Sequence, residues 1–184
     1  FFRALSLFVQ HMDEGEFLIQ ETPCFDTVGL MFDVSRNAVL TPENMKFFLR
    51  KMALMGMNLG MLYTEDTYEV EGYPYFGYMR GRYSAQDIKA LDDYAFQFGI
   101  ELMPCIQTLG HLERALRWPK MQRFKDTEEV LLAGDEDCYQ FIEAMIAAAS
   151  APYRSKRIHI GMDEAWDLGL GRYLKLNGYH PGFE

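Results

Sequence analysis

The chain is short of cysteine, histidine and long apolar runs, and each shortage excludes a class of protein. Its three cysteines, Cys24, Cys105 and Cys138, are an odd number at wide spacing, which indicates neither a disulfide framework nor a Cys-x-x-Cys metal site. We expect reduced, mostly buried thiols, and this slightly favours a cytoplasmic location. The apolar runs contain glycines and are too short to cross a bilayer, so no membrane partner is expected.

Basic residues are also in the minority, with 18 lysines and arginines against 27 acids and a net charge of −9. They form no long stripe, and an acidic surface repels a phosphate backbone, so the sequence argues against a nucleic acid partner. Neither a Gly-rich phosphate loop nor a His-x-x-x-His pair occurs. No metal or other cofactor is therefore expected.

What the chain does have is the composition of a folded domain. Apolar residues make up 49% of its 184 residues, and aromatic residues make up 15%. This is enough to bury a sizeable core in one domain or in a piece of one. The chain begins at Phe1 rather than at a methionine, so we expect it to be cut or processed.

The order of residue types repeats one unit: a short apolar strand, a polar loop, an amphipathic helix, and a glycine before the next strand. Thr41 and Ser84 stand where helix caps are needed, and each has an acid in the turn that follows. Such βα units in a row predict a parallel sheet covered by helices. We expect strands over 28–33, 58–64, 100–107 and 157–164, and helices over 3–12, 41–56, 84–99, 136–150 and 169–177.

A doubly wound sheet and a (β/α)8 barrel both fit this order, and the polar strand ends favour the barrel. Barrel enzymes gather their sites from the carboxyl ends of several strands. A barrel has eight strands in about 250 residues, so four βα units are expected to be about half of a truncated barrel. The polar groups that end the strands are Asp33 with Arg36, Glu65 with Asp66, Gln107 with His111, and Asp163 with Glu164.

The run Arg-Ile-His-Ile-Gly-Met-Asp-Glu at 157–164 is the most informative of these strand ends. Alternation along a strand puts residues 158, 160 and 162 on one face and 159, 161 and 163 on the other, with Glu164 at the carboxyl end. Two adjacent carboxylates repel each other as anions, so one holds its proton more readily, which suits a general acid beside a fixed anion. For the Asp-Glu pair alone, a helix N-terminus is the commoner explanation.

The segment His-Ile-Gly-Met-Asp-Glu at 159–164 resembles the catalytic signature of glycoside hydrolase family 20, the exo-acting β-N-acetylhexosaminidases. Asp33-Val34-Ser35-Arg36 is similar to the family's first strand with its sugar-binding arginine, and 100–111 is similar to the third strand, which ends in Gly-His. The resemblance covers roughly residues 25–180 and implies the N-terminal part of the barrel domain. We therefore divide the chain into a helical tail of a preceding domain or linker at 1–22 and the first half of the catalytic barrel at 23–184.

What the resemblance implies is a retaining hydrolysis in which the 2-acetamido carbonyl of the substrate attacks the anomeric carbon. Glu164 would act first as the acid and then as the base, and Asp163 would orient the acetamido group. Arg36 would bind ring hydroxyls of the terminal sugar through its planar guanidinium. The partner would be an oligosaccharide or glycoconjugate that ends in an N-acetyl-β-hexosamine.

Four further candidates for substrate binding carry two interpretations each. Asp33 either contacts the sugar or holds the neighbouring arginine. Glu65 and Asp66 stand where the family has paired aspartates, with the register open by one residue, so either could bind the sugar or support the site. His111 is either a sugar contact or a hydrogen-bonded core residue.

The family's better-known members carry an aspartate four residues before this histidine, whereas this chain has Gln107. The carboxylate that would fix the imidazole is therefore missing, and a strict relay through His111 is not expected. Trp166 is expected to stack on a sugar face, whereas packing is the expected role of the tyrosines in the 68–83 loop. His159 is expected to point inward below the carboxylates as a core or supporting group.

Two other functions fit the sequence. One is a barrel glycosidase that uses two protein carboxylates, with its nucleophile on a later strand. The other is a non-catalytic half-barrel that pairs with itself through its open sheet edges, since unpaired edges associate. We expect this chain alone to be inactive, because half a pocket excludes water poorly, and a homodimer through the open edges is the expected assembly.

Overall fold

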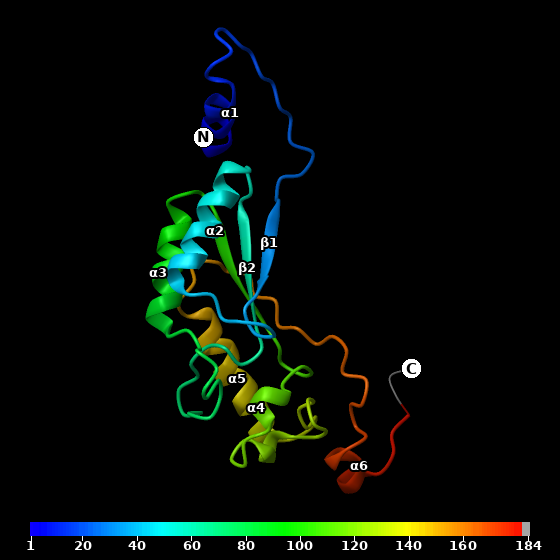
Figure 1. Cartoon of the computed structure of the whole chain (residues 1–184). Helices are drawn as coiled ribbons and strands as arrows, with labels where there is room; N and C mark the ends of the chain where they lie inside the picture. The colour runs from blue at the N-terminus through cyan, green and yellow to red at the C-terminus, as the bar shows by residue number, and fades with distance from the viewer. Residues whose placement is uncertain (182–184) are drawn as a thin grey trace.

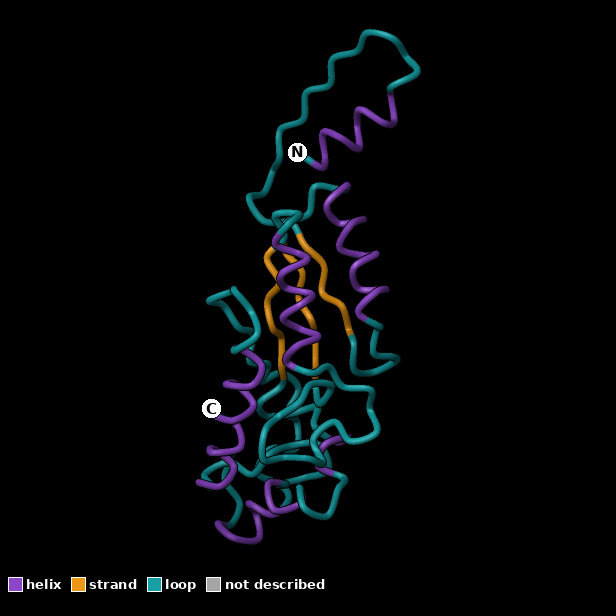
Figure 2. The backbone as a smooth tube through the Cα atoms, turned by 90° about the vertical axis from the view of Figure 1, so that its left-hand side faces the viewer, coloured by secondary structure: helices purple, strands orange, loops and turns teal. Residues whose placement is uncertain are grey.

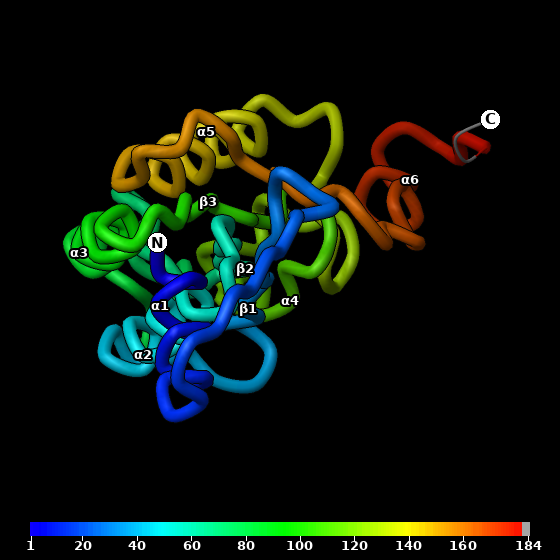
Figure 3. The backbone as a smooth tube through the Cα atoms, turned by 90° about the horizontal axis from the view of Figure 1, so that it is seen from above, coloured from blue at the N-terminus to red at the C-terminus, as the bar shows by residue number. Residues whose placement is uncertain are grey.

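The computed structural model describes residues 1–181 and has a parallel sheet of order β1-β2-β3 at its centre. The strands run side by side (Figure 1), and α2, α3 and α5 form an arc around the outside of the sheet when it is seen from above (Figure 3). The strands are β1 (Gly29–Asp33), β2 (Leu59–Thr64) and β3 (Glu101–Ile106); the helices are α1 (Phe2–His11), α2 (Pro42–Leu54), α3 (Ala85–Phe96), α4 (Glu113–Leu116), α5 (Glu136–Ser150) and α6 (Arg172–Asn177), with one 3₁₀ turn, η1 (Gln122–Phe124).

The predicted caps begin α2 and α3. The Thr41 side chain accepts a hydrogen bond from the Asn44 amide, and a proline follows at the first helical position. At α3, the Ser84 hydroxyl accepts from the Asp87 amide, and the Asp87 carboxylate accepts from the Ser84 amide in return. This reciprocal capping box satisfies two amides that the helix itself cannot pair.

The core lies between the sheet and the three outer helices. Buried side chains recur at helical spacing along each helix, which is the pattern of an amphipathic helix with one face on a sheet. β2 and β3 are mostly buried, whereas β1 is mostly exposed, because only β2 pairs with it. The buried helix residues are Met45, Leu49, Met52 and Ala53 on α2, Ile88, Leu91, Asp92 and Ala95 on α3, and Cys138, Phe141, Met145 and Ala149 on α5.

The fourth predicted strand, over 157–164, does not form as a regular strand, and this prediction is wrong in extent. The segment makes one parallel bridge, between Cys105 and His159. It runs beside β3, where the Ile106 amide donates a hydrogen bond to the His159 carbonyl at 2.8 Å and the Thr108 amide donates to the Gly161 carbonyl at 3.1 Å. The physical reason is the backbone of Gly161, whose φ of +53° is left-handed and interrupts the extended conformation.

The predicted alternation within this segment is also wrong at one position. Ile160 and Met162 are exposed, and Met162 lines the same hollow as His159 and Asp163 rather than the opposite face. His159 lines this hollow too, but it is exposed rather than part of the predicted core.

Helix α1 stands beyond the amino ends of the strands (Figure 2) and has no buried residue. It meets the rest of the chain at its first turn, where the Phe2 ring lies 5.0 Å from that of Phe98. The division at residues 22 and 23 therefore stays a prediction, and the expected end of the barrel segment at 184 lies outside the described residues. Within 1–181, no helix has both the length and the apolar character needed to cross a bilayer.

Candidate active site

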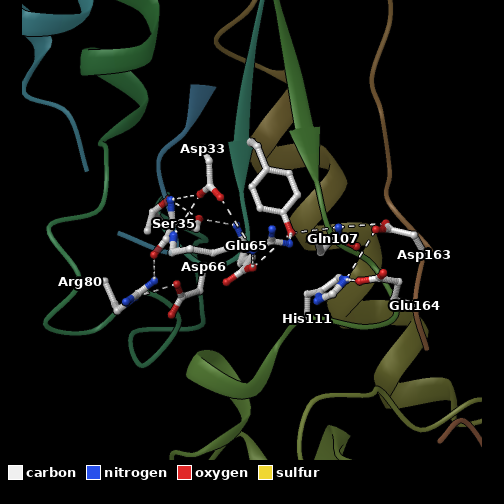
Figure 4. Close-up of polar contacts among 12 residues, drawn as sticks. Asp33, Ser35, Glu65, Asp66, Arg80, Gln107, His111, Asp163 and Glu164 are labelled. Carbon is white, nitrogen blue, oxygen red and sulfur yellow. Dashed lines mark hydrogen bonds and ion pairs between the residues drawn. The ribbon is translucent and has the colours of Figure 1, made fainter. Parts of the chain in front are cut away.

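The carboxyl ends of β1, β2 and β3 and the 157–164 segment bring their polar side chains to one end of the sheet (Figure 4). At the first of these ends, the Asp33 Oδ1 atom accepts hydrogen bonds from the backbone amides of Ser35 and Arg36, both at 3.0 Å. Its Oδ2 atom lies 3.8 Å from Arg36 Nε. Asp33 thus shapes the turn that presents Arg36, and its side chain is exposed rather than buried.

Two side chains hold Arg36 in place, one from β2 and one from the loop that follows β2. Its Nε donates to Glu65 Oε1 at 3.2 Å and its Nη2 to the Tyr63 hydroxyl at 2.9 Å. The guanidinium also lies 4.9 Å from the centre of the Tyr63 ring, a cation–π contact. About half of the arginine side chain, 52%, remains exposed, so N–H groups remain free to bind a ligand.

Tyr63 is a site residue that the sequence reasoning missed. Its hydroxyl donates to Glu65 Oε1 at 3.1 Å and accepts from Gln107 Nε2 at 3.2 Å. Burial raises the pKa of Tyr63 to about 12, so the hydroxyl keeps its proton at neutral pH. In the structure Tyr63 lies opposite Asp33 in the β1–β2 pairing, a register that short-range sequence patterns do not contain.

Asp66, the second acid of the Glu65-Asp66 pair, is fully buried and lies beside Arg80 (Figure 4). Arg80 Nε donates to its Oδ1 at 3.0 Å, and Arg80 Nη2 donates to the Ser35 carbonyl. Burial raises the pKa of Asp66, and the charge of Arg80 opposes this shift. The structure thus places Glu65 beside the exposed arginine and Asp66 beneath the loop. Arg80 lies in the tyrosine-containing loop at 68–83, and no sequence pattern indicated that it would belong to the site.

His111 faces both catalytic candidates. Its Nε2 lies 3.5 Å from Asp163 Oδ2 and 3.4 Å from Glu164 Oε2. Neither contact has the geometry of a hydrogen bond, and this nitrogen has no hydrogen-bond partner among the described residues. Consecutive side chains of a regular strand point to opposite faces. Here Glu164 has a left-handed φ of +54°, and this break in the strand lets two adjacent carboxylates approach one imidazole.

Asp163 has a second partner, Gln107, whose Nε2 donates to its Oδ1 at 3.1 Å. This hydrogen bond is the main reason that the pKa of Asp163 lies below its ordinary value. The side chains of Asp163 and Glu164 are 56% and 58% exposed. Both acids are therefore open to solvent, and they differ in that Asp163 accepts a hydrogen bond from Gln107 that favours its ionised form.

Two hollows adjoin Arg36. The larger has a volume of about 530 Å³ and contains Asp163; the smaller, about 200 Å³, is polar and contains His111. A further hollow of about 490 Å³ lies at the amino end of β3, away from the acid pair. The larger hollow is lined by Met31, Asp33, Arg36, Tyr63, Cys105, Gln107, His159, Met162 and Asp163, and the smaller by Ser35, Arg36, Glu65, Arg80, His111, Glu113, Arg114 and Glu129.

Trp166 is placed less tightly than the other candidates. It is 84% exposed, and its backbone amide donates to the Glu164 carbonyl at 2.9 Å. Its ring does not line either of the two hollows described above, so sugar stacking by Trp166 stays a prediction.

Within the described residues, the side chains that could hold a metal ion together are those of His111, Asp163 and Glu164. Their potential ligand atoms lie within 4.8 Å of one another. Two of these ligands are exposed carboxylates, and the same three groups form the acid site described above.

Comparison with known proteins gives consistent relatives. The model described as "Glycosyl hydrolase family 20, catalytic domain" matches residues 25–173. Hexosaminidase D from Bos taurus is 26% identical over 121 residues, which are 64% of this chain and 35% of that protein. A family 20 exo-β-N-acetylglucosaminidase from Vibrio harveyi, solved in complex with N-acetylglucosamine, has a TM-score of 0.71 at 18% identity and covers 88% of this chain and 32% of its own. A β-N-acetylhexosaminidase from Bacteroides fragilis has a TM-score of 0.66 at 24% identity, covering 74% of this chain and 32% of its own.

The chain spans about a third of the length of these relatives. At such identities the structural likeness establishes the fold alone. That fold is part of a (β/α)8 barrel, as predicted, with the first strands formed as a parallel sheet.

Proposed function

The chain belongs to glycosyl hydrolase family 20, whose catalytic-domain model matches residues 25–173, and on this premise we propose that the complete protein removes terminal N-acetyl-β-hexosamine residues from oligosaccharides or glycoconjugates. The observation that carries the proposal is the pair of adjacent acids, Asp163 and Glu164, whose carboxylates lie 3.5 Å and 3.4 Å from one histidine nitrogen. Asp163 also accepts a hydrogen bond from the Gln107 amide, and within residues 1–181 Glu164 has no such amide donor.

In this proposal the substrate's own 2-acetamido carbonyl attacks the anomeric carbon, so the protein needs no carboxylate nucleophile. Glu164 gives its proton to the leaving glycosidic oxygen and later takes a proton from the water that opens the oxazolinium intermediate. Asp163 stays ionised and accepts a hydrogen bond from the acetamido N–H, which orients the carbonyl and stabilises the developing positive charge.

Arg36 positions the sugar in the same proposal. Its exposed N–H groups donate to ring hydroxyls, while Glu65 and Tyr63 hold the guanidinium from the other side. Binding at the ring hydroxyls and at the acetamido group fixes both sides of the sugar, which favours a near-attack geometry.

The test is hydrolysis of 4-nitrophenyl N-acetyl-β-glucosaminide by the complete protein and by its Glu164→Gln variant. We expect turnover by the parent and a loss of roughly 10²- to 10⁴-fold in the variant, because the proton donor is gone. Glu143→Gln, at an exposed position on α5, is the matched control and should remain active.

A thiazoline analogue of the oxazolinium separates this mechanism from the two-carboxylate alternative. It should inhibit the parent strongly, since it mimics the intermediate. Turnover without thiazoline inhibition would favour a glycosidase with a protein nucleophile, and an unchanged rate in Glu164→Gln would overturn the acid/base assignment.

A further inference from the structure

Gln107 links the acid site to the arginine site, and the proposed mechanism gives it no step of its own. We propose that Gln107 is a positioning residue: its amide nitrogen fixes the Asp163 carboxylate and ties it to Tyr63 beneath Arg36. The inference deepens the proposed function and rests on it where activity is the readout.

The amide lies where it can serve only these two groups. Gln107 is 1% exposed. Its Nε2 donates to Asp163 Oδ1 at 3.1 Å and to the Tyr63 hydroxyl at 3.2 Å. The two hydrogen bonds use both protons of the amide nitrogen.

The orientation of the amide follows from its partners. An ionised Asp163 can only accept hydrogen bonds, and the Tyr63 hydroxyl donates its own proton to Glu65. Both neighbours can therefore accept from the amide nitrogen but cannot donate to the amide oxygen, so the nitrogen faces them and the oxygen faces away.

Gly161 provides the room for that oxygen. A Cβ atom at this position would lie 2.6 Å from Gln107 Oε1 and 2.3 Å from the Ile106 carbonyl oxygen. The glycine of the 157–164 segment thus has a second role besides its left-handed backbone, which is to admit the Gln107 side chain.

The resulting chain of hydrogen bonds crosses the sheet from Arg36 through Tyr63 and Gln107 to Asp163, and Figure 4 shows its last link, between Gln107 and Asp163. It sets the position of the acid relative to the arginine, and in the proposed function these two groups bind different sides of one sugar. Because Gln107 is a neutral donor, it also favours the ionised form of Asp163. An acid in its place would instead set two carboxylates against each other.

The experiment compares pH profiles of kcat/KM for the complete protein and its Gln107→Leu and Gln107→Glu variants. Removing the donor with Gln107→Leu should raise the pKa of Asp163, so the acidic limb of the profile should move to higher pH, with a roughly 10- to 100-fold lower kcat/KM at the optimum. Gln140→Leu, at an exposed position on α5, is the matched control and should leave the profile unchanged.

Gln107→Glu keeps the size of the side chain, so it guards against a folding defect in the leucine variant. The introduced carboxyl shares a proton with Asp163 at acid pH and can then donate to it, whereas at higher pH the pair becomes doubly charged. The activity of this variant should therefore shift toward acid pH, the opposite sense to Gln107→Leu. A purely structural defect would lower activity without moving the limbs in opposite directions.

An NMR titration of the Asp163 carboxyl in ¹³C-aspartate-labelled protein, assigned with Asp163→Asn, gives a readout that does not need turnover. We expect a higher pKa in Gln107→Leu than in the parent. An inactive parent with this shift would overturn the proposed function and leave the positioning role supported. Unmoved titration and unmoved pH limbs in an active parent would overturn the positioning role alone.

Discussion

At the scale of single residues, three left-handed backbone positions determine how the site is assembled. Gly161, His111 and Glu164 have φ values of +53°, +57° and +54°. Such conformations cost ordinary residues about 1 kcal/mol or more, and they persist where the surrounding structure enforces them. Here they bend the chain so that an imidazole and two neighbouring acids converge on one point.

Gly161→Ala tests this requirement directly. We expect a loss of about 2–4 kcal/mol in the free energy of unfolding, because the new methyl group would overlap the Ile106 carbonyl oxygen in addition to the left-handed strain. Gly99→Ala is the matched control, since Gly99 has a φ of +70° with nothing within 4 Å of its Cβ position. It should cost only about 1 kcal/mol in urea denaturation. Equal losses would show that the crowding at Gly161 is absent.

The buried acid beneath the site gives a second residue-scale prediction. Arg80→Met should lower the free energy of unfolding by about 3–5 kcal/mol, because it leaves the fully buried Asp66 without its cation. Lys89→Met, which removes an ion pair with Asp93 on an exposed part of α3, should cost less than about 1 kcal/mol. Denaturation curves that place the two variants together would contradict the buried pairing.

Whether a site residue could be predicted from the sequence depends on the kind of contact that it makes. Asp163 and Glu164 carry a pattern that depends only on chain order, and they could be singled out from it. Tyr63 and Arg80 act through contacts that depend on strand register and on the path of a long loop, which short-range patterns do not contain. The choice between Glu65 and Asp66 was open for the same reason, since one residue of register decides which acid meets Arg36 and which meets Arg80.

At the scale of elements, helix ends were predictable and the last strand was not. Thr41, Ser84 and Asp87 act through local hydrogen bonds that a cap requires wherever it occurs. A strand needs a partner along its length as well as a suitable sequence. The 157–164 segment pairs with β3 at a single bridge and is interrupted by its own glycine. Its apolar sequence alone therefore predicted a more regular strand than the one that forms.

The capping box of α3 gives the prediction at this scale. Ser84→Ala should cost about 1 kcal/mol of stability, whereas Ser150→Ala, at the last residue of α5, should cost a few tenths. Hydrogen bonds from Ser84 hold the pKa of Asp87 below its ordinary value. The stabilisation by Asp87 is therefore present above that ordinary pKa and is lost as pH falls through the lowered one, so the difference between Ser84→Ala and the parent should narrow in acid. A pH-independent difference would argue against the reciprocal cap.

At the scale of the whole molecule, the sheet has apolar side chains along edges that no described strand covers. Leu30 and Met31 on β1 are 40% and 54% exposed, and Ile160 and Met162 beyond β3 are 40% and 58% exposed. Unpaired parallel edges with exposed apolar groups favour association.

We therefore expect this 184-residue chain to self-associate when it is isolated. Size-exclusion chromatography with light scattering should give at least twice the 21.4 kDa chain mass. Leu30→Lys should shift the population toward monomer, because a charge at the edge opposes strand pairing. Phe96→Lys, at an exposed position on α3, is the control and should leave the mass unchanged. A monomer at all concentrations would count against edge pairing.

The weak attachment of the 157–164 segment also has a consequence in time. A few backbone hydrogen bonds to β3 hold it, whereas β2 is paired along both sides. Local opening is most frequent where the fewest bonds must break. We therefore expect the stretch that carries both acids to open more often than β2, so that the Ile106 and Thr108 amides exchange with deuterium sooner than those of β2. A sugar that bridges Arg36 and Asp163 would make these openings rarer. Sugar binding should therefore slow the deuterium exchange of the Ile106 and Thr108 amides, although the sugar contacts neither of them.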